Sequence, residues 1–279
     1  MITKNIRGVD ISYFQSEDPV IGILNQGSFF GESNFNMLNY FIKKKSRIID
    51  CGCHIGTFSV PALLAGYKVS AIDGAYKNIE CLRQTAKQFK GRLDVFENIL
   101  SDRVKKCSFS TDSGPFGSLV EDEEGDLTSQ TLDNLCETSG YHNICAIKYD
   151  LEGGEIDALK GSRETLSKHK APLLIEVNGS ALLNNKQSIK DLFNVIEDLD
   201  YKIYHLINTQ RGTIIHSINK DKFFPFCVTD VVCVNNDELH QHEFLKQAKE
   251  LTDDQIDNIA SDNYKISNSC CKKYFDSVM

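Results

Sequence analysis

Hydrophobic residues along this chain follow two alternating patterns, one typical of strands and the other of helices. Short apolar runs predict strands at 48–50, 69–73, 93–102, 144–150, 172–178, 201–207 and 227–235. Between several of these runs, apolar residues recur every three or four positions, as at Ile79, Leu82, Ala86 and Phe89, which predicts helices with one apolar face. Strands and helices therefore alternate over most of the chain.

This alternation predicts an α/β fold, in which a mostly parallel sheet is covered by helices on both faces. The last two predicted strands, 201–207 and 227–235, have no convincing helix between them. Because a parallel pair needs a long crossover connection, we expect these two strands to pair antiparallel.

The patterns also divide the chain into three parts. Residues 1–45 lead into the first core strand, 46–236 form the main domain, and 237–279 are polar with a helical pattern. In the last part, one helix face would carry Phe244, Leu245, Ala248 and Leu251. This C-terminal helical appendage could dock on the main domain or form the contact of a homo-oligomer.

Composition narrows the class of protein. Of the 279 residues, 41% are hydrophobic, which is enough for a sizeable core, and the net charge is −8. Such an acidic chain does not favour a broad electrostatic grip on nucleic acid. The sequence has no signal-peptide pattern and no apolar window long enough to span a membrane, so we expect a cytoplasmic protein. Its ten cysteines form no disulfide framework and are expected to be reduced.

The stretch 47–59, RIIDCGCHIGTFS, carries the clearest chemical signal. A short strand ends at Asp50, glycines follow at Gly52 and Gly56, and a helix begins. The spacing lacks the third glycine of the dinucleotide fingerprint G-x-G-x-x-G. The acid would repel a pyrophosphate but attract the ammonium group of S-adenosylmethionine, whose carboxylate can reach N–H groups at a helix start.

A second strand ends at Asp73, 23 residues after Asp50. An acid at roughly this offset takes ribose hydroxyls in nucleotide-binding folds, although a helix-capping role is the alternative. Asn98 and Ile99 end the third strand, where they could meet an adenine or simply pack. Glu32 precedes the first core strand and could reach the cofactor or cap a helix.

Carboxylates crowd the end of the strand 144–150. Asp150, Glu152 and Glu155 lie within six residues beside a glycine pair, and Glu176 ends the next strand. Ligands of open α/β sheets bind at this edge, so we expect a site here. Asp150 or Glu152 is the candidate general base, with Glu155, Glu176 and His142 as weaker candidates. Alternatively, Asp150 with Glu152 or Glu176 could hold a divalent cation.

These motifs together resemble the FkbM-type S-adenosylmethionine-dependent methyltransferases. IIDCGCHIGTFS resembles the first motif of that family, AIDGAYKN the acidic second-strand segment, and ENILSD the end of the third strand. The most diagnostic similarity is IKYDLEGGEIDALKG, with TLDNL before it and PLLIEVN after it. The similarity covers 46–235. Where the family often has alanine and glutamate, this chain has Cys53 and Asp73.

The resemblance implies a Rossmann-like class I methyltransferase fold with a seven-stranded, mostly parallel sheet and an antiparallel last strand. It also implies methylation of a hydroxyl on a sugar or glycan-like small molecule. Asp150 and Glu152 are the expected catalytic residues, and no residue is assigned as a metal ligand. The cofactor would be S-adenosylmethionine, and its binding residues would be Glu32, Asp50, Gly52, Cys53, Gly56, Phe58, Ser59, Asp73, Gly74, Asn98 and Ile99.

Three other functions share the same sequence features. An RNA ribose 2′-O-methyltransferase would use the same cofactor, although the acidic composition disfavours it. A nucleotide-dependent oxidoreductase would share the sheet, but the third glycine of its fingerprint is missing. A noncatalytic nucleoside-binding module would not need the acids at Asp150 and Glu152.

Overall fold

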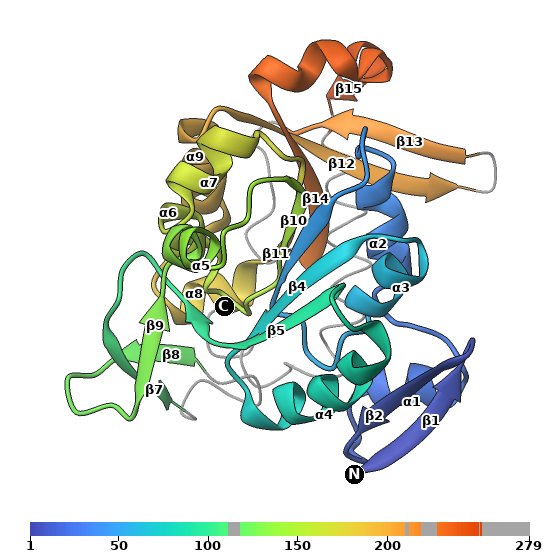
Figure 1. Cartoon of the computed structure of the whole chain (residues 1–279). Helices are drawn as coiled ribbons and strands as arrows, with labels where there is room; N and C mark the ends of the chain where they lie inside the picture. Colours follow the sequence, from blue (N-terminus) through green and yellow to red (C-terminus); the bar gives the residue numbers. More distant parts are fainter. Residues whose placement is uncertain (111–117, 210–211, 219–227, 251, 253–279) are drawn as a thin grey trace.

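A large mixed sheet organises the protein (Figure 1). The computed structural model describes residues 1–110, 118–209, 212–218, 228–250 and 252. The sheet has nine strands in the order β15-β13-β12-β14-β11-β10-β3-β4-β5. Its parallel part comprises β3 (Arg47–Cys51), β4 (Lys68–Asp73), β5 (Leu93–Glu97), β10 (Ile144–Tyr149) and β11 (Leu173–Asn178). The predicted α/β class is thus confirmed.

The antiparallel part of the sheet is larger than the sequence suggested. β14 (Val228–Asn235) runs antiparallel between β11 and β12 (Tyr201–Thr209), which confirms the expected pairing of the last two predicted strands. β13 (Gly212–Ser217) forms a hairpin with β12, and the short β15 (Lys249–Glu250) pairs parallel with β13. The predicted count of seven strands is therefore wrong, because this hairpin and the segment after β14 extend the sheet edge.

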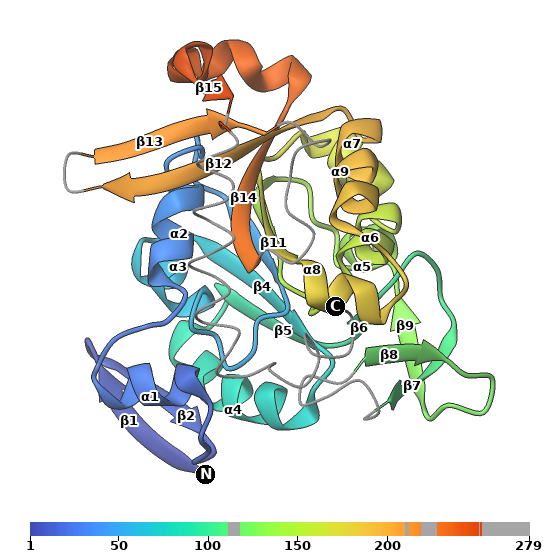
Figure 2. The same ribbon diagram turned by 180° about the vertical axis from the view of Figure 1, so that it is seen from behind.

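Helices cover both faces of the sheet (Figures 1 and 2). One face carries α2 (Glu32–Asn39), α3 (Ser59–Leu64) and α4 (Tyr76–Ala86), while α1 (Pro19–Asn25) lies farther out, beside the N-terminal residues of the chain. The other face carries α5 (Leu132–Thr138), α6 (Glu155–Lys160), α7 (Arg163–His169), α8 (Gly179–Asn184) and α9 (Ile189–Asp198). Each face has its own hydrophobic core because successive strand residues point to opposite sides.

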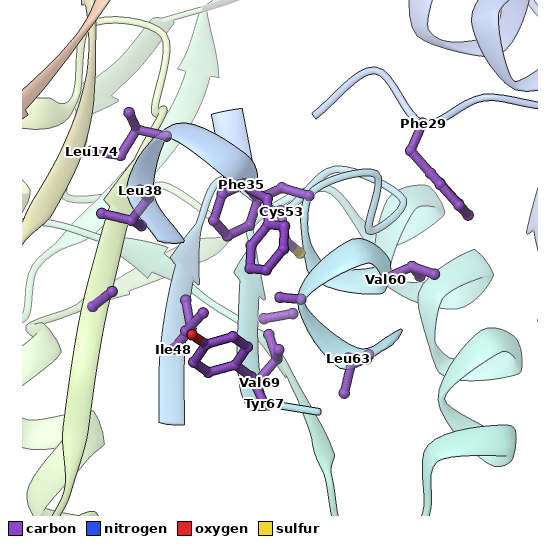
Figure 3. Close-up of a cluster of buried hydrophobic side chains, with 14 of the residues drawn as sticks. Phe29, Phe35, Leu38, Ile48, Cys53, Val60, Leu63, Tyr67, Val69 and Leu174 are labelled. Carbon is purple, nitrogen blue, oxygen red and sulfur yellow. The ribbon is translucent and has the colours of Figure 1, made fainter. Parts of the chain in front are cut away.

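Figure 3 shows part of the core under α2 and α3. Phe35 and Leu38 project from α2 toward Ile48 on β3 and Val69 on β4, and Cys53 lies within the same cluster. The Phe35 ring contacts Phe58 and Tyr67 edge to face, with centroids about 6 Å apart. This packing fixes the segment between β3 and α3 against the sheet.

Smaller elements surround the main sheet. An N-terminal hairpin of β1 (Ile2–Ile6) and β2 (Val9–Tyr13) packs on α4, and a second sheet joins β6 (Ile99–Leu100), β7 (Lys106–Ser110), β8 (Ser118–Glu121) and β9 (Leu127–Gln130). A short 3₁₀ helix, η1 (Lys87–Phe89), follows α4.

The described cysteines are free thiols. Among the described helices, none has the length and apolar character to cross a membrane.

The segment after β14 differs from the expected helix. It forms two 3₁₀ helices, η2 (Asn236–Gln241) and η3 (Glu243–Gln247), before β15. Phe244 and Leu245 therefore lie on a 3₁₀ turn, and Ala248 is extended, so the α-helical face predicted for these residues is wrong. Leu251 and residues 253–279 lie outside the described part, and the boundaries of the three predicted parts stay predictions.

Candidate active site

The site lies at the edge of the sheet where the parallel strands end, which we call the carboxyl edge. There the turn after β3 faces the ends of β4, β10 and β11. In open α/β sheets this edge holds the ligand, because the loops that leave neighbouring strands diverge and open a crevice.

Gly52 allows the turn after β3 to fit against β10. Its φ is +79°, and its N–H and that of Cys53 both donate to the carbonyl oxygen of Ile72 on β4. A Cβ atom on Gly52 would lie 1.7 Å from the carbonyl oxygen of Asp150. Only glycine fits this approach, since it combines a left-handed conformation with no side chain.

We expect Gly52→Ala to lower the free energy of unfolding by roughly 4 kcal/mol, because the turn must move away from β10. The matched control is Gly66→Ala, where φ is +94° and nothing lies within 4 Å of the added Cβ. That control should cost only the strain of its backbone conformation, about 1–2 kcal/mol. Denaturant titration measures both values, and equal losses would show that contact with Asp150 is unimportant.

Gly56 is the second constrained glycine of the turn. Its φ is +91°, and an added Cβ would lie 2.6 Å from a methyl carbon of Leu82 on α4. The close packing of the turn on α4 therefore depends on a residue without a side chain.

Asp73 braces the glycine turn from β4. Its carboxylate accepts hydrogen bonds from the N–H groups of His54 and Ala75, both at 2.8 Å, and from the Asn78 amide at 3.3 Å. Burial raises the pKa of Asp73 although these bonds favour the charged form. These bonds close the turn before α4 without capping that helix, whose N-cap is Ala75, and contact of Asp73 with a ribose stays a prediction.

Lys148 links the two acids that the sequence singled out. Its Nζ lies 3.3 Å from Oδ1 of Asp50 and 3.0 Å from Oδ2 of Asp150, and it donates to the carbonyl oxygen of Gly52 at 3.1 Å. Burial would lower the pKa of Lys148, but the charges of Asp150 and Asp50 outweigh it and the pKa is raised. The ammonium group is therefore fully protonated at neutral pH.

Sequence reasoning did not assign a role to Lys148. A lysine inside an otherwise apolar strand was the available signal, because a buried charge needs a partner. The side chain of Asp50 is fully buried and also accepts a hydrogen bond from Ser59 at 2.6 Å. The ammonium group of Lys148 already lies beside this carboxylate. Direct contact of Asp50 with the ammonium group of the cofactor therefore stays a prediction.

Phe58, Ser59 and Cys53 surround this charged pair from the side of α3. The Phe58 ring lies 5.7 Å from Nζ of Lys148, a cation–π distance, and Ser59 has no exposed surface. Cys53 is buried in the core, and burial raises its pKa well above that of a free thiol. These side chains shape the turn from beneath.

Three carboxylates meet at the ends of β10 and β11. One oxygen each of Asp150, Glu152 and Glu176 lies within 4.8 Å of the others. Glu152 accepts a hydrogen bond from Asn178 at 3.3 Å, and burial together with the charge of Asp150 raises its pKa to about 7. Burial and the charges of Asp150 and Glu152 raise the pKa of Glu176 well above its usual value. Glu152 therefore titrates near neutral pH, and Glu176 holds its proton to a higher pH than a free carboxyl group does.

Asp230 is a further acid that the sequence did not point to. It lies on β14 directly opposite Glu176, and its Oδ2 accepts a hydrogen bond from Asn34 of α2 at 3.0 Å. Burial, followed by repulsion from Asp150, raises its pKa to about 7. No local pattern around Asp230 could have placed it here, because its position depends on the insertion of β14 beside β11.

Glu155 begins α6 and is fully buried, with Oε1 accepting the N–H of Leu151 at 2.7 Å. It thus closes the turn that carries Asp150 and Glu152. Burial raises its pKa from 4.5 to about 7. This contact with the backbone of its own loop is structural, and the weaker role of Glu155 as a base stays a prediction.

The raised pKa of Glu155 makes stability depend on pH. The folded state binds this proton more tightly than the unfolded state does, so protonation of Glu155 favours folding. This stabilisation is complete below pH 4.5 and is lost as the pH rises through 7. We expect the free energy of unfolding of wild type to fall between pH 5 and 8, and Glu155→Gln to remove up to about 3 kcal/mol of that fall. Exposed Glu137→Gln is the control. Identical pH profiles for Glu155→Gln and wild type would contradict the assignment.

The remaining predicted residues lie in different surroundings. Glu32 forms a two-bond ion pair with Arg7 of the N-terminal hairpin, at 2.5 and 2.9 Å. The Asn98 N–H donates to the carbonyl oxygen of Asp73, which places Asn98 and Ile99 beside the end of β4, close to Gly74. Their cofactor contacts stay predictions.

His142 is the one candidate base that the fold excludes. It precedes β10, whereas Asp150 follows that strand, so the six residues of Ile144–Tyr149 separate them. At about 3.3 Å per residue, the two side chains lie at opposite edges of the sheet.

This arrangement defines a doubly wound α/β protein with an acid-rich ligand site at its carboxyl edge. Residues 50–203 match the family model described as the methyltransferase FkbM domain. Because the match spans more than half of the 279 residues, the chain belongs to the FkbM methyltransferase domain family.

Solved structures with a related arrangement include the methyltransferase FkbM from Methylobacillus flagellatus. It is 20% identical over 77% of this chain and 58% of its own, with a TM-score of 0.44, so the present chain spans less than two thirds of it. Precorrin 8w decarboxylase from Methanobacterium thermoautotrophicum is 16% identical, over 73% of this chain and 88% of its own, with a TM-score of 0.40.

Magnesium protoporphyrin IX methyltransferase from Synechocystis, crystallised with bound S-adenosylmethionine, is 12% identical over 80% of this chain and 86% of its own, with a TM-score of 0.40. A search of curated protein sequences found no match to this chain.

Proposed function

We propose that this protein is an S-adenosylmethionine-dependent methyltransferase that methylates a hydroxyl group of a sugar or glycan-like small molecule. The observation that carries the proposal is the convergence of Asp150, Glu152 and Glu176 beside the glycine turn. Membership in the FkbM family supports the reaction type. The glycine turn would hold the methyl donor, and the neighbouring acid cluster would supply the base that accepts a proton from the acceptor hydroxyl.

The cofactor is assigned to the turn after β3 and the end of β4. Backbone groups of Gly52 to Gly56 border this space, and Asp73 is the acid for the ribose hydroxyls, with Asn98 and Ile99 near the adenine. Asp50 acts through Lys148, because its carboxylate is buried beneath the turn. The ion pair fixes both the turn and Asp150 in one arrangement.

Glu152 is the base of the proposed reaction. Its pKa of about 7 lets it accept a proton at neutral pH while still being ionised in part. Asp150 is held by Lys148 and orients the acceptor hydroxyl. Bound S-adenosylmethionine would supply an electrophilic methyl group, and Glu152 would accept the proton of the acceptor hydroxyl that Asp150 orients. Alignment of the two reactants can supply on the order of 7–11 kcal/mol.

Two measurements test this function. Calorimetry should show binding of S-adenosylmethionine and no binding of a nicotinamide dinucleotide, whereas the reverse would indicate an oxidoreductase. Incubation with methyl-labelled cofactor and separate sugar, lipid and RNA fractions should label the sugar fraction. Label in RNA would favour the ribose methyltransferase, and cofactor binding without any transfer would favour a nucleoside-binding module.

The same carboxylates also fit a divalent cation as a second form of the mechanism. Three oxygens within 4.8 Å of one another are a suitable set for a hard cation, which would lower the pKa of the acceptor hydroxyl. Loss of transfer on chelation and recovery with magnesium would support this form. Full activity in the presence of chelator would leave Glu152 as the base.

A further inference from the structure

A cavity lies at the opposite edge of the sheet, where the parallel strands begin. We call it the rear cavity; its floor is formed by Asn143, Ile144 and Pro172 near the starts of β10 and β11. Its volume is about 380 Å³, within the range of small-molecule sites. The candidate active site is a full strand length away, so the rear cavity is independent of the proposed function.

Cations dominate the walls of the rear cavity although the protein as a whole is acidic. Lys43, Lys44, Lys168 and Lys170 line it, and the one acidic residue in its lining is Glu238. These lysines come from two segments far apart in the sequence, which the fold brings together. Walls of one sign focus the local potential and attract the opposite charge.

The lysines of the rear cavity are only partly neutralised. Lys43 donates to the carbonyl oxygen of Gln241, and Lys170 pairs with Asp237. Lys44 and Lys168 have no hydrogen bond or ion pair within the described residues. The positive charge of Lys168 lies near the negative C-terminal end of the α7 dipole, but that end carries only about half an elementary charge. A net positive charge therefore remains.

Three histidines extend the same wall. His142, His169 and His242 line the cavity, and burial followed by repulsion from Lys168 and His142 lowers the pKa of His169. His242 is 97% buried, with its ring stacked among Phe41 and Phe244 at centroid distances of 5.6 Å. Its Nδ1 is buried and has no hydrogen-bond partner among the described residues.

We propose that the rear cavity binds a small, multiply charged oxyanion of the phosphate class. Lys44 and Lys168 would supply the charge, and the imidazole of His242, which lines the cavity, would supply a directed hydrogen bond. A small ligand fits better than a polymer backbone, because the cationic groups converge on one cavity and do not extend as a stripe over the surface.

Calorimetry with pyrophosphate tests this site. Wild type should bind, and the double variant Lys44→Gln, Lys168→Gln should bind at least tenfold more weakly. Lys90→Gln, which makes the same change at an exposed lysine that does not line the cavity, should bind like wild type. Absence of binding by wild type, or equal affinity of the double variant, would overturn the proposal.

Two further variants make the result specific. His242→Phe keeps an aromatic ring against Phe41 and Phe244 but removes the nitrogen, so we expect several-fold weaker pyrophosphate binding in a folded protein. None of these variants should change the affinity for S-adenosylmethionine, which separates failure here from failure of the proposed function. If a short RNA bound more tightly than pyrophosphate, the ligand of the rear cavity would be a nucleic acid, and the proposal of a small oxyanion would be overturned.

Discussion

Lys148→Met is expected to lower the free energy of unfolding by about 3–5 kcal/mol, the largest stability effect among the described ion pairs. The side chain of Lys148 is 6% exposed and that of Asp50 is fully buried, so neither charge has water as a substitute partner. Removal of the ammonium leaves Asp50 without its cation and Asp150 without its anchor. The measurement is chemical denaturation at neutral pH.

A double variant distinguishes loss of the charge pair from loss of packing. In Asp50→Asn, Lys148→Met the buried charge is gone on both sides, so we expect much of the lost stability to return. Lys160→Met is the matched control, because that lysine is 44% exposed and lies 4.0 Å from Asp157. Such a surface pair contributes at most about 1 kcal/mol. A double variant as unstable as Lys148→Met would refute the charge explanation.

Glu152→Gln is expected to lower the rate of methyl transfer by about 10²–10⁴-fold, the contribution typical of a general base. The amide can keep the hydrogen-bonding shape beside Asn178 but cannot accept the acceptor's proton. Cofactor affinity should stay within twofold of wild type, because Glu152 lies on the acceptor side of the glycine turn. Single-turnover kinetics with labelled cofactor measure the transfer, and calorimetry measures the affinity.

Comparison with Asp150→Asn separates a base from an orienting residue. That variant loses the charge that pairs with Lys148, so we expect both slower transfer and a moderate loss of stability. In wild type the rate should rise with pH through about 7 as Glu152 ionises, and in Glu152→Gln this rise should vanish. A pH profile unchanged by Glu152→Gln would assign the base to another group. Exposed Glu137→Gln is the control for the charge change.

Most elements of the core could be predicted from the sequence. The strands 48–50, 69–73 and 172–178 match β3, β4 and β11, because a buried parallel strand has a local signature of apolar residues ending in a polar turn. The turn at Gly52 is equally local, since its backbone conformation excludes other residues. Acids at strand ends could be assigned to one edge because parallel strands all end there.

Extra strands and the segment after β14 escaped prediction for a physical reason. β13 belongs to the sheet only because β12 offers it an edge, and β15 only because β13 does, and short strands take their conformation from such pairing more than from their own sequence. For the same reason, the apolar spacing at Phe244 and Leu245 suggested an α-helix where the structure has a 3₁₀ turn.

The family, the alternation of strands and helices, and the concentration of acids around Asp150 could all be inferred from the amino-acid sequence, because each depends on residues that are close together in the chain. Tertiary structure alone decided that Lys148 joins Asp50 to Asp150, that Asp230 faces Glu176, and that His142 lies at the other edge. The strength of a charge depends on its burial and on neighbours from distant segments, and strand pairing sets both.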